Sequence, residues 1–255
     1  MGNESTIAIK FVDVGFRLPE GKTLLSELNL IVERGETLML LGRSGSGKTT
    51  SLKMINRLLT PTTGEVFVNG ISVTHWDVIQ LRRGIGYAIQ DVGLFPHYTV
   101  RENVALIPRL ERWDRDKTAR RVDEVLTLVG LPAVEFAGRY PHELSGGQRQ
   151  RVGLARSLAA EPPILLMDEP FGALDPISRA ELQKEFKRLQ EKLGKTIVFV
   201  THDVGEALML GSRIALMEAG RLRGVFRPEE FVNSGDATVK AYVEVFRDGQ
   251  QMFRN

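Results

Sequence analysis

A glycine-rich loop between an apolar segment and a helix-forming segment restricts the fold of this chain more than any other feature. Residues 42–49 (GRSGSGKT) match the pattern G-x-x-x-x-G-K-[ST] at every fixed position. The preceding residues 37–41 (TLMLL) form a continuous apolar run, which is typical of a strand covered on both faces. Residues 49–59 favour a helix. A strand, such a loop and a helix in direct succession predict an α/β core built around a parallel sheet.

The residue types in the loop explain how it would bind phosphate. Glycines let backbone N–H groups converge on an anion, because a side chain or a restricted φ angle would obstruct the concave turn. Lys48 would contact the β- and γ-phosphates of ATP, and the Thr49 hydroxyl would help coordinate Mg²⁺. A glycine-rich turn without a ligand is disfavoured by the flanking strand and helix. The residues predicted to bind ATP here are Gly42, Arg43, Ser44, Gly45, Ser46, Gly47, Lys48, Thr49 and Thr50.

Two adjacent carboxylates end a second apolar run. Asp168 and Glu169 follow residues 164–167 (ILLM), and side chains at the carboxyl end of a parallel strand project into the crevice where ligands bind. We expect Asp168 to help hold Mg²⁺ and Glu169 to orient or activate the attacking water. An acidic helix cap before Pro170 is the alternative. Beside a complete phosphate loop, the catalytic interpretation is favoured.

The remaining patterns predict two kinds of sheet and a helical region. Residues 66–68 and 71–73 predict a hairpin around Asn69-Gly70, so antiparallel strands accompany the parallel ones. Residues 100–160 have a helical pattern with charged stretches, which indicates a helical lobe. A predicted helix at 176–193 lies between two apolar runs and restores the strand-helix-strand order of a parallel sheet. The C-terminal residues favour a strand followed by short helices.

Composition excludes several other classes of protein. The 34 basic and 32 acidic residues nearly cancel, so the chain has no global charge signature for nucleic acid or anionic lipid. Cysteine is absent, which excludes disulfides, thiolate metal sites and a cysteine nucleophile. No apolar run approaches the roughly 18 residues of a membrane-spanning helix. Any association with a membrane would therefore have to go through another protein.

The segment 144–148 (LSGGQ) resembles the signature sequence of ABC ATPases, and a helix-like run follows from Arg149 to Ala160. It is a second anion-binding turn at a helix N-terminus, where a hydroxyl and an amide can donate to a phosphate oxygen. In the family this turn binds the γ-phosphate held by the opposite subunit, so the resemblance implies a homodimer with two ATP molecules between its subunits. Taken alone, the five residues would be an ordinary capped helix start. The signature residues are Ser145, Gly146, Gly147 and Gln148.

The other family elements occur in the expected order, and the resemblance covers about residues 7–217. Gln90 matches the glutamine that senses Mg²⁺ and the attacking water. Residues 172–175 (GALD) resemble the loop that links the two active sites, with Asp175 as its carboxylate. His202 matches the switch histidine that contacts the γ-phosphate. A lone glutamine is usually a surface residue and a lone histidine a satisfied polar group, but the order and spacing here favour the catalytic interpretation.

One position departs from the family pattern. Four residues after Val14, where the family usually has an aromatic residue that stacks on adenine, this chain has Leu18. A leucine packs against a base without a π-face. Phe16 lies two positions earlier and would share the same face if the segment is a strand. Leu18 and Phe16 are therefore the two candidates for contacting adenine, and we expect weak stacking.

The segment after Gln90 is the predicted surface for a partner. Residues 91–103 mix apolar and aromatic side chains with a proline, and they are more apolar than an ordinary solvated loop. In importers of the family this region receives a short cytoplasmic helix of the permease, which is a helix-in-groove contact. The alternative is that these side chains fill the core of the helical lobe. The residues expected to contact the permease are Leu94, Phe95 and Pro96.

Short stretches narrow the resemblance further. Residues 53–58 (KMINRL), 81–87 (LRRGIGY) and 93–97 (GLFPH) resemble the ATPase subunits of osmoprotectant importers, which carry glycine betaine, choline, carnitine or proline. Many such subunits continue into paired regulatory domains, for which the 255 residues leave no room, so regulation by that route is not expected. An importer of another small solute and a soluble ABC ATPase outside transport are the alternatives.

The resemblance thus implies an α/β fold of the P-loop NTPase (ABC ATPase) type in a single domain over residues 1–255. We expect a RecA-like core with an N-terminal antiparallel β subdomain (about 1–95 and 161–225), an inserted helical subdomain (about 96–160) and a helical tail (226–255). The implied ligands are ATP and Mg²⁺. The implied partners are a second copy, the permease subunits and, indirectly, an extracytoplasmic substrate-binding protein, with no nucleic acid. The implied location is the cytoplasmic face of the cell membrane.

Overall fold

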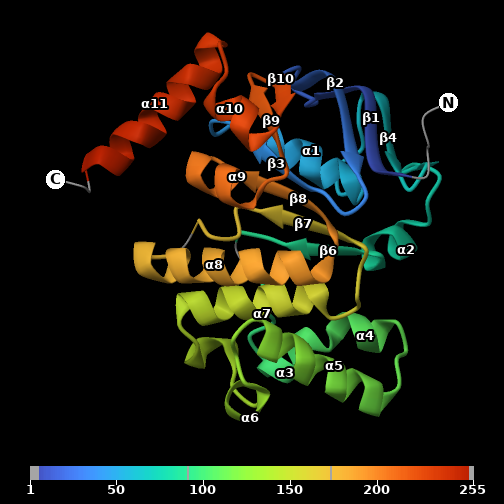
Figure 1. The fold of residues 1–255 in the computed structure, drawn as a ribbon. Coiled ribbons are helices and arrows are strands. Elements are labelled where there is room, and N and C mark those ends of the chain that lie inside the picture. Colours follow the sequence, from blue (N-terminus) through green and yellow to red (C-terminus); the bar gives the residue numbers. More distant parts are fainter. Residues whose placement is uncertain (1–5, 91, 173, 253–255) are drawn as a thin grey trace. The chain divides into compact units, whose positions relative to one another are not determined.

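The computed structural model describes residues 6–90, 92–172 and 174–252 (Figure 1). The chain divides into two compact units. The first unit comprises Met1–His75 and Val198–Asn255, and the second comprises Trp76–Ile197.

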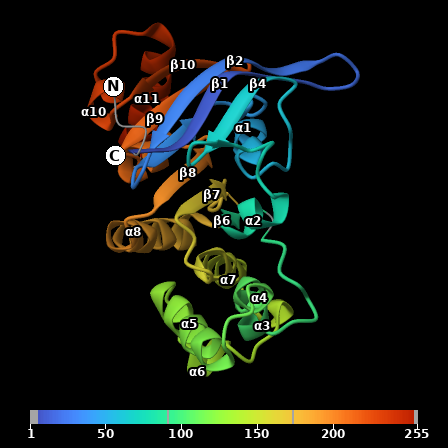
Figure 2. The same cartoon turned by 90° about the vertical axis from the view of Figure 1, so that its right-hand side faces the viewer.

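The first unit contains an antiparallel sheet with the strand order β2-β1-β4-β5, and Figure 2 shows β2, β1 and β4 side by side. Between β4 and β5, Asn69 and Gly70 have positive φ angles of 51° and 79°. Two successive positive φ angles are the backbone of a two-residue hairpin turn, so the predicted hairpin is confirmed. The strands are β1 (Ile7–Arg17), β2 (Thr23–Glu33), β4 (Thr63–Val68) and β5 (Ile71–Ser72).

A second set of strands in the same unit carries the phosphate loop. Their order is β10-β9-β3-β8, in which β3 and β9 are parallel and β9 and β10 antiparallel. Every residue of β3 and β8 is buried, as their continuous apolar runs predict. The strands are β3 (Thr37–Leu41), β8 (Thr196–Thr201), β9 (Arg213–Glu218) and β10 (Arg221–Phe226).

The described part of the first unit also contains the helices α1 (Lys48–Ile55), α9 (Val204–Leu210), α10 (Pro228–Val232) and α11 (Ala237–Met252). Helix α1 packs against β2 and β4. It ends before the predicted Leu59, because Asn56 closes it and Arg57 has a φ angle of 53°. The expectation of only short helices at the C-terminus is wrong, since α11 has 16 residues. Its inner side chains pack against α9 and α10, which a local pattern does not reveal.

The second unit pairs two parallel strands with a set of helices. Strands β6 (Ile85–Ala88) and β7 (Ile164–Asp168) are in parallel register. Helix α7 packs against β6, α3 and α5. The other helical elements are α2 (Val78–Arg83), α3 (Val100–Val104), α4 (Leu106–Leu110), α5 (Arg115–Leu128), α6 (Ala133–Phe136), the short 3-10 helix η2 (Pro141–Glu143), α7 (Gly146–Leu158) and α8 (Pro176–Leu193).

Helix α8 has the bounds that the sequence predicts. Asp175 is its N-cap and accepts the backbone N–H groups of Ile177 and Ser178 at 3.1 and 3.0 Å. Pro176 occupies the first helical position, and Gly194 ends the helix in a left-handed conformation with φ 55°. These are the usual start and stop signals of a helix.

The predicted fold class is confirmed: parallel core strands, an N-terminal antiparallel sheet and a separate helical region are all present. Among the described residues, no helix is both long and apolar enough to cross a bilayer.

Candidate nucleotide-binding site

The phosphate loop has a backbone that only glycine fits at two positions. Gly45 and Gly47 have φ angles of 78° and 99°, in the region that L side chains rarely adopt. A Cβ atom on Gly47 would lie 2.5 Å from Cδ2 of Leu25, and a Cβ atom on Gly42 would lie 2.3 Å from the carbonyl oxygen of Met217. The loop is therefore a tight concave turn, and β2 and β9 pack directly against it.

The polar groups of the loop fit an anion of the size and charge of a nucleotide phosphate chain. Lys48 is only 5% exposed, and its ammonium group donates to the carbonyl oxygens of Gly42 and Arg43 at 2.8 and 2.9 Å. The Ser46 hydroxyl is buried without a hydrogen-bond partner among the described residues. A buried cation and an unsatisfied hydroxyl are both costly. A phosphate group in the turn would offset both costs.

The two candidates for contacting adenine lie in different local structures. Phe16 is inside β1 and pairs with Leu25 of β2, whose side chain packs against Gly47. Leu18 lies beyond the end of β1, in a turn where its N–H donates to the carbonyl of Lys22 at 2.9 Å. The strand alternation that would place Phe16 and Leu18 on one face therefore stops between them. Phe16 is the candidate linked to the loop through a strand neighbour.

His202 lies in the first unit as well, directly after the buried strand β8. The turn that carries it is closed by hydrogen bonds: the Asp203 N–H donates to Oγ1 of Thr201 at 2.9 Å, and the Glu206 N–H donates to Oδ1 of Asp203 at 3.1 Å. His202 is exposed. Together with Arg43 of the phosphate loop it lines a cavity of about 620 Å³. The switch candidate and the phosphate loop thus face the same space.

The acidic pair lies in the second unit at the end of β7. Asp168 is 8% exposed, and the Tyr87 hydroxyl donates to its Oδ2 at 3.5 Å. Burial of the phenol and the charge of Asp168 raise the pKa of Tyr87 above its usual value. Glu169 is half-buried and has a positive φ of 45°. A strained backbone at a non-glycine residue is common at functional sites, and here it lies directly after the end of β7.

Gln90 lies close to the acidic pair within the second unit. An ideal Cβ on Gly172 would lie 3.3 Å from the carbonyl oxygen of Glu169 and 3.8 Å from Nε2 of Gln90. The Gly172 N–H donates to the same carbonyl at 3.0 Å. The sequence separates these residues widely, but the fold brings the Gln90 amide to the turn that follows Glu169. Asp91, the next residue, lies outside the described residues.

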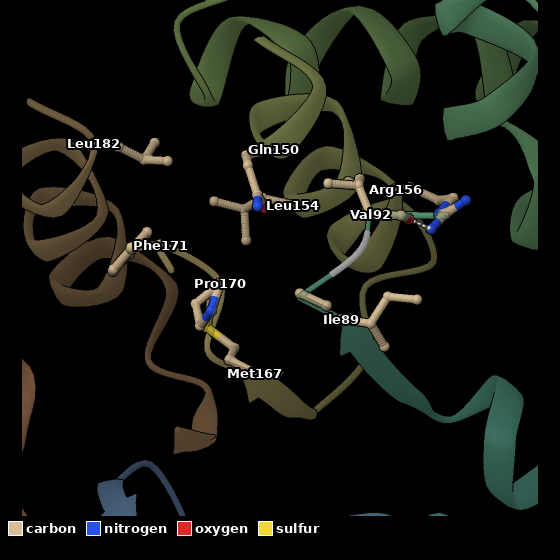
Figure 3. Close-up of a pocket in the computed structure, with 11 residues that line it drawn as sticks. Ile89, Val92, Gln150, Leu154, Arg156, Met167, Pro170, Phe171 and Leu182 are labelled. Atoms are coloured by element: carbon tan, nitrogen blue, oxygen red, sulfur yellow. Dashed lines mark hydrogen bonds between the residues drawn. The ribbon is translucent and has the colours of Figure 1, made fainter. Parts of the chain in front are cut away.

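The segment after Gln90 is fastened to helix α7. Gln150 donates to the carbonyl of Gln90 at 3.2 Å, and the Arg156 guanidinium donates to the carbonyls of Val92 and Gly93 at 2.6 and 2.8 Å. Figure 3 shows these side chains around a small cavity of about 10 Å³, with Arg156 beside Val92. Sequence reasoning missed Arg156, because its partners are 63 and 64 positions away.

The signature segment forms the start of α7. The Ser145 oxygen accepts the Gln148 N–H at 3.2 Å, and the Gln148 side chain accepts the Ser145 N–H at 2.9 Å, which is a capping box. No heavy atom lies within 4 Å of an ideal Cβ on Gly146, and on Gly147 the nearest is 3.8 Å away. Because the Ser145 oxygen is only an acceptor in this cap, its proton remains able to donate to a ligand.

The loop before α8 is held by its own helix. Asp175 caps α8, and hydrogen bonds from the side chain and backbone of Ser178 lower the pKa of this carboxyl. The Arg179 guanidinium donates to the carbonyls of Phe171, Gly172 and Leu174 at 3.2, 3.3 and 3.2 Å. Sequence reasoning missed Arg179, although its place four residues after the helix cap was a usable signal. Ala173 of the predicted GALD loop lies outside the described residues.

The segment predicted to contact a permease lines a groove. Phe95 is 41% exposed, so it does not fill the core of the helical lobe. It borders a cavity of about 310 Å³ together with Leu106 and Ile107. Beneath it, fully buried Asn103 donates to the carbonyls of Phe95 and Tyr98, both at 3.1 Å. These bonds fix the loop and hold the ring at the surface. Leu94 is half-buried, and Pro96 is exposed.

The family model described as "ABC transporter" matches residues 25–172. The chain is 48% identical over 235 residues to the glycine betaine/carnitine/choline transport ATP-binding protein of Bacillus subtilis (strain 168), covering 92% of this chain and 61% of that protein. It is 50% identical over 224 residues to the choline transport ATP-binding protein of the same strain, covering 88% of this chain and 58% of that protein.

A solved structure of a dimeric ATP-binding cassette in a post-hydrolysis state, bound to ADP and phosphate, matches with a TM-score of 0.77 and 35% identity. The match covers 86% of this chain and 98% of that one. The chain spans about three fifths of the length of the two curated relatives, at 61% and 58%.

Proposed function

The chain belongs to the ABC transporter family, and from this premise we propose that it is the ATP-binding and ATP-hydrolysing subunit of an importer for small quaternary ammonium osmoprotectants. The phosphate loop is the observation that carries the proposal. It combines two left-handed glycines, a buried Lys48 ammonium that donates to the loop's own carbonyl oxygens, and a buried Ser46 hydroxyl without a hydrogen-bond partner among the described residues. These groups complement a phosphate chain and have no equally good use without one.

In this proposal, binding of ATP transfers the Lys48 ammonium from the carbonyls of Gly42 and Arg43 to the β- and γ-phosphates. Thr49, Asp168 and Gln90 supply the oxygen ligands that would hold Mg²⁺. When bound, Mg²⁺ neutralises charge that develops on the phosphate oxygens. The donor set, a hydroxyl, a carboxylate and an amide, suits a small hard cation.

Hydrolysis requires a group that positions the attacking water. Glu169 is the proposed base, since its half-buried carboxylate lies at a strained turn beside the Gln90 amide. His202 is proposed to contact the γ-phosphate from the turn after β8. A base and a hydrogen-bond donor of this kind work by orienting the water and stabilising charge in the transition state.

The signature turn supports a homodimer. Ser145 and Gly147 offer a hydroxyl proton and a backbone amide at the start of α7. The space beside Gly146 is open, and the nearest atom to an ideal Cβ on Gly147 is at an ordinary contact distance of 3.8 Å. We propose that these groups bind the γ-phosphate held by a second copy. Asp175, which caps α8, would transmit closure of the dimer to the active site of the second copy.

The importer assignment rests on the groove beside Phe95 and on the two curated relatives, whose names describe transport of glycine betaine, carnitine and choline. An exposed aromatic ring at the edge of a groove lined by apolar side chains and three arginines suits a short amphipathic helix. We propose that a permease helix occupies the groove. This contact would hold the chain at the cytoplasmic face of the membrane. An extracytoplasmic substrate-binding protein would act on the chain only indirectly, through the permease.

The hydrolytic proposal is tested by Glu169→Gln, which preserves size and removes the base. Loss of a general base typically costs 10²- to 10⁴-fold, so we expect the ATPase rate to fall by at least about 100-fold. An ATP-dependent dimer should appear in size-exclusion chromatography. The exposed Glu181 on α8 provides the control Glu181→Gln, which should leave the rate unchanged. An unaltered rate in Glu169→Gln would remove the catalytic assignment.

The importer proposal is tested separately in vesicles that contain the chain and its co-purified permease subunits. ATP-dependent uptake of labelled choline or glycine betaine is expected, with competition by carnitine. Phe95→Ala should abolish association with the permease and leave nucleotide affinity intact. Uptake of an unrelated solute would overturn the substrate class, and a chain that co-purifies with no membrane subunit would overturn the importer role.

A further inference from the structure

Helix α11 forms one wall of the cavity that His202 and Arg43 line. The cavity of about 620 Å³ lies wholly within the first unit. On one side it is bordered by the phosphate loop, the turn after β8 and the end of β9. On the other side it is bordered by the α11 residues Thr238, Ala241, Tyr242, Val245 and Phe246.

One side chain of α11 touches the turn that carries His202. An ideal Cβ on Gly205 would lie 3.2 Å from Cε2 of Phe246 and 3.0 Å from Oδ1 of Asp203. The edge of the Phe246 ring therefore rests on the backbone of Gly205, in the first turn of α9. Asp203 follows His202 directly and caps that same helix. The ring thus packs on the same turn that the hydrogen bond from the Asp203 N–H to Thr201 closes.

The ring is not what attaches α11 to the unit. Val239 and Val243 are 1% and 4% exposed and form the buried stripe of the helix. The start of α11 is fixed by Asp236, which accepts the backbone N–H groups of Thr238 and Val239 at 2.8 and 3.1 Å. Phe246, by contrast, is half-buried at the rim of the cavity. Its removal would leave the helix in place and leave the turn before α9 without its outer support.

We propose that Phe246 is a positioning residue for His202: by packing on Gly205 it holds the turn at residues 202–205 and so fixes the direction from which the imidazole reaches a phosphate. The proposal rests on the proposed ATPase function. In this arrangement α11 acts on the catalytic step without touching the nucleotide, because the phosphate loop binds ATP through other residues.

Kinetics of Phe246→Ala provide the first test. Misplacing a catalytic group by about 1 Å can cost up to about 100-fold, so we expect kcat to fall by roughly tenfold or more. The KM for ATP and the affinity for nucleotide should stay unchanged, since the phosphate loop is not altered. Phe246→Leu, which retains bulk over Gly205, should restore most of kcat. Val245→Ala is the matched control, because Val245 borders the same cavity at 74% exposure but is not among the atoms nearest to Gly205.

Side-chain NMR of histidine provides the second test and does not depend on hydrolysis. The chain has four histidines, so the Cε1–H signal of His202 can be assigned by its loss in His202→Asn. We expect this signal to shift or broaden in Phe246→Ala and to stay in place in Val245→Ala.

The possible outcomes separate the two proposals. Equal signals and equal kcat in Phe246→Ala and Val245→Ala would overturn the positioning role. A parallel loss of kcat, nucleotide affinity and melting temperature in Phe246→Ala would overturn it too, because the ring would then serve folding alone. A wild-type chain that does not hydrolyse ATP, with a His202 signal that still responds to Phe246→Ala, would overturn the proposed function and leave the placement of the turn intact.

Discussion

Gly147→Ala separates the stability of helix α7 from its proposed contact with phosphate. The added Cβ would lie 3.8 Å from Cδ2 of Leu174 and 3.9 Å from Cβ of Ser178, which are ordinary van der Waals distances. In a helix, alanine is favoured over glycine by about 0.5–1 kcal/mol. The free energy of unfolding should therefore rise by about that amount, which corresponds to an increase in melting temperature of about 1–4 °C for a chain of this size.

The activity of the same variant should change in the opposite direction. The Gly147 amide is proposed to donate to a phosphate oxygen on a second copy, and a methyl group beside it would keep that oxygen at a distance. Loss of one such donor typically costs about 10²- to 10³-fold. We expect an ATPase rate lowered by about 100-fold and unchanged affinity for nucleotide in the monomer, measured by titration with a fluorescent analogue.

The control for this prediction is Gly153→Ala in the same helix. Its Cβ would lie 2.3 Å from Cγ1 of Val92, so the change should destabilise the unit by about 1–3 kcal/mol through overpacking. A wild-type ATPase rate in Gly147→Ala would refute the phosphate contact. A lower melting temperature in Gly147→Ala, comparable with that of Gly153→Ala, would refute the steric reasoning.

Three further predictions concern single side chains. Leu18→Tyr should tighten ATP binding by about 1 kcal/mol, roughly fivefold, through stacking on adenine; unchanged affinity in a calorimetric titration would exclude a contact at this position. Arg179→Ala should slow hydrolysis and leave nucleotide affinity intact, because the carbonyls of Phe171, Gly172 and Leu174 each lose a hydrogen bond. Arg179→Lys should not restore the rate, since one ammonium cannot replace the guanidinium fork. Burial and the charge of Asp168 raise the pKa of Tyr87 above 10.0, so the folded state favours the neutral phenol. The contribution of this neutral phenol to stability is complete below pH 10 and is lost as the pH rises further. In urea unfolding between about pH 9 and pH 11, the free energy of unfolding should therefore fall less steeply with pH in Tyr87→Phe than in the wild type.

The parts of the fold that the sequence predicted depend on local signals. The bounds of α8 follow from Asp175, Pro176 and Gly194, each of which acts within one turn of the helix. The hairpin follows from two residues that tolerate a positive φ. The phosphate loop follows from glycines whose backbone angles other residues rarely adopt. In each case the physical cause and the sequence pattern occupy the same few residues.

The features that sequence reasoning missed depend on contacts between distant residues. The Arg156 guanidinium donates hydrogen bonds to the carbonyls of Gly93 and Val92, which are 63 and 64 positions away in the sequence. The contact of Phe246 with Gly205 requires α11 to fold back onto α9. No local periodicity reports such contacts, because an arginine or phenylalanine on a helix is compatible with many partners. Arg179 is intermediate, since its partners lie 5 to 8 positions away and helix spacing alone could have suggested them.

The signature turn shows why a structural and a functional interpretation of one motif need not exclude each other. Ser145 and Gln148 form a complete capping box, so these two residues would be explained by helix stability alone. The glycines between them are not explained in this way. Gly146 has no atom within 4 Å of an ideal Cβ, and neither Gly146 nor Gly147 has a positive φ, so alanine would fit at both positions and would favour the helix. Glycine at these two positions lowers helix stability relative to alanine, and no contact inside the chain explains that choice. It points to a group outside the chain that approaches the backbone, and the N–H groups at this helix start favour an anion.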